Sequence, residues 1–184
     1  MEEDDMNPIL ESWKTLADGY SERLDVVGSD QWDQASNCDG WSVRDLVKHT
    51  IDVQCKIPDA LGAGVGGDLG DDLVSEWSRV STAAIAAFQT DGAMDKVVEG
   101  PMGEAPVAQA LGLPSMDLLV HTFDLARSTG GDEKLPEDIV EHAFESIKPM
   151  DAMLRGEGMF HQKVEVGDDA NLQTQFIAFT GRQP

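Results

Sequence analysis

Residues 117–126 read DLLVHTFDLA, a stretch that is apolar except for three polar positions and Thr122. If the stretch is helical, at about 100° per residue, Asp117, His121, Asp124 and Ser128 fall on one narrow stripe. Apolar residues cover most of the remaining surface, and a helix that is hydrophobic nearly all round is usually buried. The stripe therefore either faces the protein interior or is a thin solvent strip on an otherwise covered helix.

Apolar residues at steps of three and four residues predict further helices around this one. The predicted helices cover residues 8–27, a segment that starts after Ser42, residues 73–88, about 115–128, a segment from Pro136 to about Pro149, and about 170–180. Short extended pieces are expected at 97–98 and 163–166. Ser42 and Asp45 form an S-x-x-D capping signature for the second helix. The prediction is one mainly α-helical domain over residues 1–184, a bundle of four or five helices whose connections contain short additional elements.

Charge and composition limit the partners that the chain can have. It carries 35 acidic and 13 basic residues, a formal net charge of -22. A phosphate-binding surface needs clustered Lys and Arg, so nucleic acid and anionic membranes are not expected as partners. No run approaches the roughly 18 apolar residues of a membrane span, and the acidic N-terminus lacks the apolar segment of a signal peptide. We therefore expect a cytoplasmic protein whose two cysteines, Cys38 and Cys55, are free thiols.

Asp117 and His121 are four residues apart, so their side chains meet on one helix face. Two such groups can supply adjacent ligands to one divalent metal, and a carboxylate with imidazoles suits zinc, nickel, iron or manganese. A third ligand must come from another helix, and His49 on the second helix is the natural choice. The alternative is a buried histidine paired with a carboxylate in a purely structural role. Asp124 is an acceptor that orients an imidazole, a fourth ligand, or a capping and surface charge.

Four segments carry motifs that are specific when they occur in combination. They are NCDGWSVRDLVKH (37–49), GPMGEAPVAQALGLPSMDLLVHTFDLARSTG (100–130), LPEDIVEHAF (135–144) and RGEGMFHQKVEVGDDANLQTQFIAFTGRQP (155–184). Together they resemble the actinobacterial branch of the DinB-like superfamily, which includes the mycothiol-dependent maleylpyruvate isomerases. The resemblance implies a four-helix bundle, here with an extra C-terminal helix, that holds a divalent metal near one end through three side chains.

Matched position by position, the resemblance assigns the metal ligands to His49, Asp117 and His121, with zinc as the first choice of metal. Asp124 would then tune a histidine from outside the ligand set. The isomerases carry Glu where this chain has Asp117, which is one methylene shorter. Phe123 stands where related sequences often have Trp, a difference that we interpret as packing.

The resemblance also implies a reaction. A divalent metal presents a low-molecular-weight thiol, mycothiol, as its thiolate, which attacks a small electrophile in an isomerisation or an S-transfer. The expected partners are a small-molecule thiol and an electrophile, with a homodimer left open. A metal-binding module without turnover and a metal-dependent hydrolase are the alternatives.

Other polar residues have less specific expectations. Arg44 and Arg127 are two of the 13 basic residues. We expect each either to contact an anionic substrate or to pair with nearby acidic residues. His142 and His161 are expected on the surface. Cys38 is expected to be a packed thiol, although the segment before the second helix could bring it to the site.

Overall fold

The computed structural model describes residues 7–100, 102–156, 159–167 and 169–184. The chain forms two compact units, Met1–Glu133 and Lys134–Pro184. The single domain over residues 1–184 stays a prediction. None of the helices in the described residues combines the length and the apolar character that crossing a bilayer requires.

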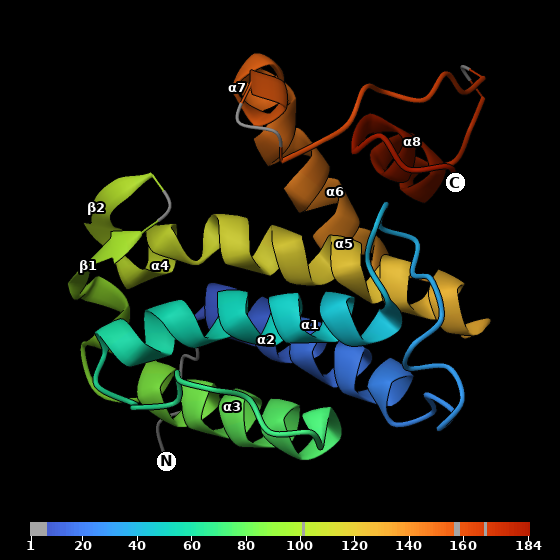
Figure 1. The fold of residues 1–184 in the computed structure, drawn as a ribbon. Helices are drawn as coiled ribbons and strands as arrows, with labels where there is room; N and C mark the ends of the chain where they lie inside the picture. Colours follow the sequence, from blue (N-terminus) through green and yellow to red (C-terminus); the bar gives the residue numbers. More distant parts are fainter. Residues whose placement is uncertain (1–6, 101, 157–158, 168) are drawn as a thin grey trace, which may run out of the picture. The chain divides into compact units, whose positions relative to one another are not determined.

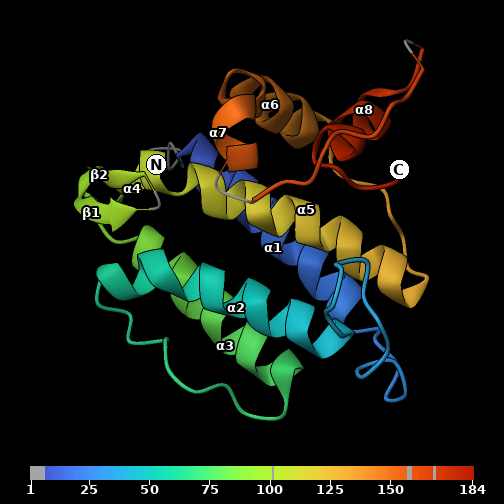
Figure 2. The same cartoon turned by 45° about the horizontal axis from the view of Figure 1, so that its top comes forward.

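Four long helices form the first unit (Figure 1). They are α1 (Pro8–Leu24), α2 (Val43–Ala60), α3 (Leu73–Phe88) and α5 (Gly112–Thr129). Both α3 and α5 pack against α1 and α2, so the four helices close a bundle around one core. Figure 2 shows the Gly-rich connection after α2 returning along the bundle, so that α2 and α3 run in the same direction. The predicted four-helix bundle is confirmed.

The helix ends follow from local sequence. The side chain of Ser42 accepts a hydrogen bond from Asp45 N, and the Asp45 side chain accepts one from Ser42 N, so the predicted capping box starts α2. Helix α5 begins three residues earlier than expected, because Pro114 is compatible with the first turn of a helix. It ends at Gly130, whose φ of 74° places it in the left-handed region.

Aromatic side chains fill much of the bundle interior. Trp13 and Phe88 meet edge to face with ring centroids 5.4 Å apart, and Tyr20 and Trp77 do so at 4.8 Å. The indole N–H of Trp13 donates to Gln54 Oε1, 3.1 Å away, so its polar atom is satisfied inside the core. These contacts join α1 to α2 and α3.

The connection between α3 and α5 holds a small hairpin. After a 3₁₀ turn η1 (Ala93–Asp95), strand β1 (Val97–Gly100) pairs antiparallel with β2 (Gly103–Pro106), and α4 (Val107–Ala110) follows. The short strand expected at 97–98 is therefore present and longer. Strand β2 was not predicted, because its sequence GEAP contains none of the β-branched or aromatic residues that favour strands.

The second unit contains α6 (Glu137–Ile147), the 3₁₀ turn η2 (Lys148–Met150), α7 (Asp151–Gly156) and α8 (Leu172–Phe179). Phe144 of α6 packs against Phe176 and Phe179 of α8, with centroids 6.0 and 5.4 Å away. Helix α6 ends just before Pro149, as expected, but the short α7 was not predicted. Residues 163–166 lie outside any strand, and Val164 N donates to Ala178 O.

Candidate metal centre

The polar stripe of α5 faces the protein interior. The side chain of Asp124 is completely buried, and His121 is only 7% exposed. The apolar residues between them are buried as well, because α5 packs against both α1 and α2. The alternative of a thin solvent strip is therefore wrong, and the stripe points toward α2 and the segment that precedes it.

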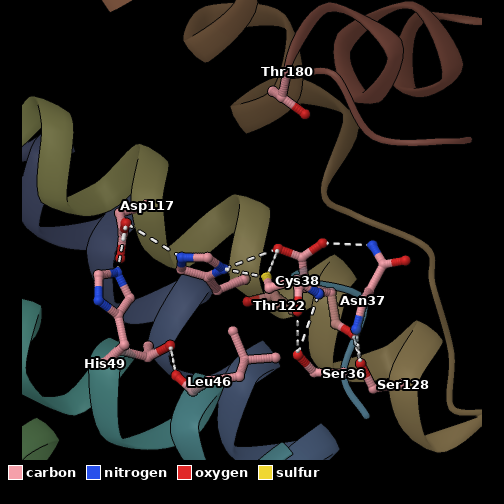
Figure 3. Close-up of polar contacts among 12 residues, drawn as sticks. Ser36, Asn37, Cys38, Leu46, His49, Asp117, Thr122, Ser128 and Thr180 are labelled. Carbon is pink, nitrogen blue, oxygen red and sulfur yellow. Dashed lines mark hydrogen bonds and ion pairs between the residues drawn. The ribbon is translucent and has the colours of Figure 1, made fainter. Parts of the chain in front are cut away.

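The three predicted ligands come together at this place (Figure 3). Asp117 Oδ1 lies 3.4 Å from His49 Nε2 and 3.4 Å from His121 Nε2. The ligand atoms of all three residues lie within 4.8 Å of one another. The two imidazole rings meet edge to face, with centroids 5.1 Å apart. One histidine of α2 and the Asp/His pair of α5 thus direct three ligand atoms to one point.

These residues fit a divalent metal. Zinc bonds to nitrogen and oxygen are about 2.0–2.2 Å long, so neighbouring ligand atoms of a tetrahedral zinc are about 3.3–3.5 Å apart. The two spacings of 3.4 Å match that value. Asp117 Oδ2 is also buried and has no hydrogen-bond partner among the described residues, whereas buried carboxylate oxygens are normally satisfied. A cation beside Asp117 would satisfy it, and the shorter side chain still reaches both histidines.

His121 is oriented from its other ring nitrogen. Its Nδ1 lies 2.9 Å from Asp124 Oδ2, while its Nε2 faces Asp117. A proton held on Nδ1 by Asp124 leaves the Nε2 lone pair available to a metal. Because Asp124 stands on the far edge of the ring from Asp117, this geometry supports an orienting role over the fourth-ligand alternative.

Hydrogen bonds between the carboxylates and the histidines outweigh the effect of burial on the pKa values at this site. Burial raises the pKa of the Asp117 carboxyl, but hydrogen bonds from His121 and His49 outweigh it and hold the pKa well below its ordinary value. Burial lowers the pKa of His121, but Asp117 and Asp124 outweigh it and raise the pKa well above its ordinary value. Both carboxylates therefore favour the charged, doubly protonated form of the His121 ring in the metal-free protein.

A tight turn before α2 adds residues to the site that the sequence did not assign to it. Ser36 N donates to Trp41 O at 2.8 Å, and Trp41 N donates to Cys38 O at 3.1 Å. Gly40 makes this turn possible with a φ of 79°, a conformation that glycine adopts without steric cost. The turn presents Asn37, Cys38 and Trp41 to α5 and to the start of α2.

Two of these residues contact Asp124. Asn37 Nδ2 donates to Asp124 Oδ1 at 2.7 Å, and Cys38 Sγ donates to Asp124 Oδ2 at 3.4 Å (Figure 3). Cys38 Sγ also lies 4.0 Å from His121 Nδ1. The position of Cys38 agrees with the alternative that the segment before the second helix brings it to the site, whereas Asn37 was not considered. Their position directly before the capping box of α2 is the sequence signal that could have drawn attention to them.

Trp41 covers one side of the histidines. Its ring centroid lies 4.8 Å from that of His49 and 6.3 Å from that of His121. The His49 side chain is 37% exposed, whereas that of His121 is 8% exposed. The His49 side of the site is therefore more exposed than the His121 side.

The two arginines proposed for substrate binding each pair with an acid. Arg44 Nε lies 3.3 Å from Asp33 Oδ1, and Arg127 Nη2 lies 2.5 Å from Glu133 Oε2. Their contact with a substrate stays a prediction. His142 and His161 are exposed, as expected.

Comparison with known proteins relates this arrangement to one family. Residues 13–72 match the family model of the mycothiol maleylpyruvate isomerase N-terminal domain. Two crystal structures of mycothiol-dependent maleylpyruvate isomerase, one of a point mutant, share the fold, each with a TM-score of 0.58 over 79% of this chain and 70% of the other, at 16% identity. Residues 13–72 are therefore similar to the N-terminal domain of that family, and the fold is similar to that of the isomerase.

Two relatives of nearly equal length are also similar to this chain. Two uncharacterized proteins of Mycobacterium tuberculosis, from strains CDC 1551 and H37Rv, are each 26% identical over 180 residues. The match covers 96% of this chain and 98% of theirs. The segment that matches the family model contains His49 and the turn before α2, whereas Asp117, His121 and Asp124 lie beyond it. The α5 residues of the site are therefore identified by their distances to His49 and to one another, and not by the family match.

Proposed function

We propose that the protein binds one divalent metal through His49, Asp117 and His121 and uses it to activate a low-molecular-weight thiol against a small electrophile. Zinc is the expected metal, with nickel, iron and manganese as alternatives, and mycothiol is the expected thiol. The observation that carries the proposal is the convergence of two imidazole Nε2 atoms on Asp117 Oδ1, each at 3.4 Å, beside the unpartnered Asp117 Oδ2.

A bound dication would supply Lewis acidity, which lowers the pKa of a neighbouring thiol so that it is a nucleophile at neutral pH. The protein's own residues prepare the place for this chemistry. Asp117 contributes a negatively charged oxygen between the neutral imidazole ligands His49 and His121. Asp124 keeps the Nδ1 proton on His121. Three protein ligands leave coordination positions for small molecules, as in catalytic rather than structural metal sites.

The surroundings favour a small substrate that enters from one side. Buried residues of α5 close the site behind His121, and the partly exposed His49 marks the open side. Trp41 offers an apolar face next to this opening, which limits water beside the reacting groups. A thiol and a compact electrophile can meet there, which agrees with the maleylpyruvate named for the related isomerase.

Metal content is the first test. Protein purified without added metal should contain about one equivalent of a divalent metal, and His49→Ala and His121→Ala should lose it. His142→Ala is the matched control, because it removes an exposed histidine of α6. Undiminished metal in both site variants would end the metal proposal.

Thiol dependence is the second test. Maleylpyruvate and other small electrophiles are supplied with and without mycothiol, and both substrate and free thiol are followed. An isomerase leaves the thiol concentration unchanged, whereas an S-transferase consumes one thiol per turnover. Turnover that is independent of thiol would instead support the hydrolase, and metal binding without turnover would support a binding module.

A further inference from the structure

The buried Asp124 carboxylate is held through both of its oxygens. Oδ2 is 2.9 Å from His121 Nδ1 and accepts the Cys38 thiol at 3.4 Å, while Oδ1 accepts the Asn37 amide at 2.7 Å. A buried carboxylate is costly unless such donors surround it. Because Asn37 takes the oxygen that His121 does not use, the carboxylate plane is fixed at two points and cannot rotate away from the ring.

The Asn37 side chain is itself fixed by the backbone around it. Asn37 N donates to Ser128 Oγ at 2.8 Å, and that hydroxyl donates to the backbone oxygen of Asp124 at 2.6 Å. The segment is therefore attached to α5 one helical turn beyond Asp124. Through the Gly40 turn the same segment leads into the Ser42 cap of α2, the helix that carries His49.

We infer that Asn37 is a positioning residue of the metal centre, which fixes Asp124 so that His121 directs its Nε2 toward Asp117 and His49. Cys38 assists as a thiol donor to the same carboxylate. The inference rests on the proposed function, because the residue that Asn37 ultimately positions is a proposed metal ligand. Asn37 does not contact the three ligand atoms, so its effect is transmitted through Asp124 and His121.

A competing arrangement exists for the same side chains. Cys38, His121 and Asp124 also offer ligand atoms within 4.8 Å of one another, a set that could hold a metal of its own. Such a metal would have to displace the proton between His121 Nδ1 and Asp124. The short contact of 2.9 Å at that position favours the positioning role.

The experiment compares zinc affinity by competition with a chromophoric chelator in the full chain. Asn37→Ala should bind zinc about 10–100-fold more weakly, the usual effect of losing an outer hydrogen bond at a metal site. Asn37→Gln keeps the amide and should recover part of the affinity. Ser128→Ala is the comparison variant: it loosens the segment that carries Asn37 but leaves both Asp124 oxygens with their donors, so its loss of zinc affinity should be smaller than that of Asn37→Ala.

Two further measurements separate positioning from general stability. Cobalt bound to Asn37→Ala should show a visible spectrum shifted from that of the unaltered protein, because His121 is less well directed. Urea unfolding of the metal-free forms should show that Asn37→Ala and Ser128→Ala lower the free energy of unfolding by similar amounts. Cys38→Ser, which keeps a donor, should retain affinity better than Cys38→Ala.

The possible results are distinct. Unchanged zinc affinity and cobalt spectrum in Asn37→Ala, or an equal loss in Ser128→Ala, would overturn the inference while the proposed metal site stands. A second zinc equivalent that disappears in Cys38→Ala would overturn it in favour of a ligand role for the thiol. No zinc binding by the unaltered protein would overturn the proposed function and this inference with it.

Discussion

Asp124 is wholly buried, and its Oδ2 lies 2.9 Å from Nδ1 of His121. This contact decides which ring nitrogen of His121 is available, because the nitrogen that holds a proton for Asp124 cannot bind a metal. The other nitrogen faces Asp117, which also faces His49. One carboxylate outside the proposed ligand set is therefore placed to orient the part of the site that α5 supplies.

Replacing Asp124 tests this relationship. Asp124→Asn preserves the size of the side chain but removes the charge that supports the His121 ring. We expect zinc affinity to fall about 10–100-fold. Isothermal titration or chelator competition would measure it, with the exposed Asp138→Asn in α6 as the control. Equal affinity in both variants would show that Asp124 merely sits beside His121.

Zinc binding should release a proton. The pKa of His121 lies well above its ordinary value in the metal-free protein, which favours a proton on Nε2 that zinc must displace. Affinity should therefore rise about tenfold per pH unit below the folded-state pKa of His121 and level off above it. The pKa of Asp117 lies well below its ordinary value, so it adds no proton near neutrality. A constant affinity between pH 6 and about 8 would contradict this proton competition.

Trp41 should report metal binding directly. Its ring lies 4.8 Å from that of His49, so Cu²⁺ bound at the site should quench its fluorescence efficiently. Titration of the unaltered protein should give a saturable loss of emission, and Trp41→Phe should lose most of that change. Trp32→Phe, in the same segment, should keep it. Quenching that persists in Trp41→Phe would place the copper elsewhere.

The length of the acidic ligand is the subject of a further prediction. In this chain the Asp117 carboxylate already stands 3.4 Å from both Nε2 atoms, so an added methylene displaces its oxygens. We expect Asp117→Glu to retain zinc with about tenfold lower affinity. Asp117→Asn removes the negative charge and should lower zinc affinity by more than about a hundredfold. Dialysis against buffered zinc would measure both, and an Asn variant that binds better than the Glu variant would be inconsistent with a carboxylate ligand.

The sequence predicted the parts of the fold that are regular. Helical spacing placed Asp117, His121 and Asp124 on one stripe of α5. His49 of α2 was the natural choice of third ligand, and the resemblance assigned the same residue. Those residues are adjacent in the structure because α2 and α5 pack against each other. The bundle itself follows from apolar periodicity, which decides the faces that four helices bury.

The residues that spacing missed lie in irregular backbone. Asn37, Cys38 and Trp41 reach the site only because the chain turns at Gly40, and no periodic pattern records the direction of that turn. Strand β2 escaped prediction for a related reason. Its pairing with β1 is a tertiary contact that its own sequence does not favour.

Anomalous diffraction from zinc-loaded crystals is the most direct test of the proposed centre. Data collected on both sides of the zinc absorption edge should show one strong peak bounded by His49 Nε2, Asp117 and His121 Nε2. A crystal of His121→Ala treated in the same way should lack it. A peak on Cys38 and Asp124, or no peak between His49 and Asp117 in the unaltered protein, would contradict the account.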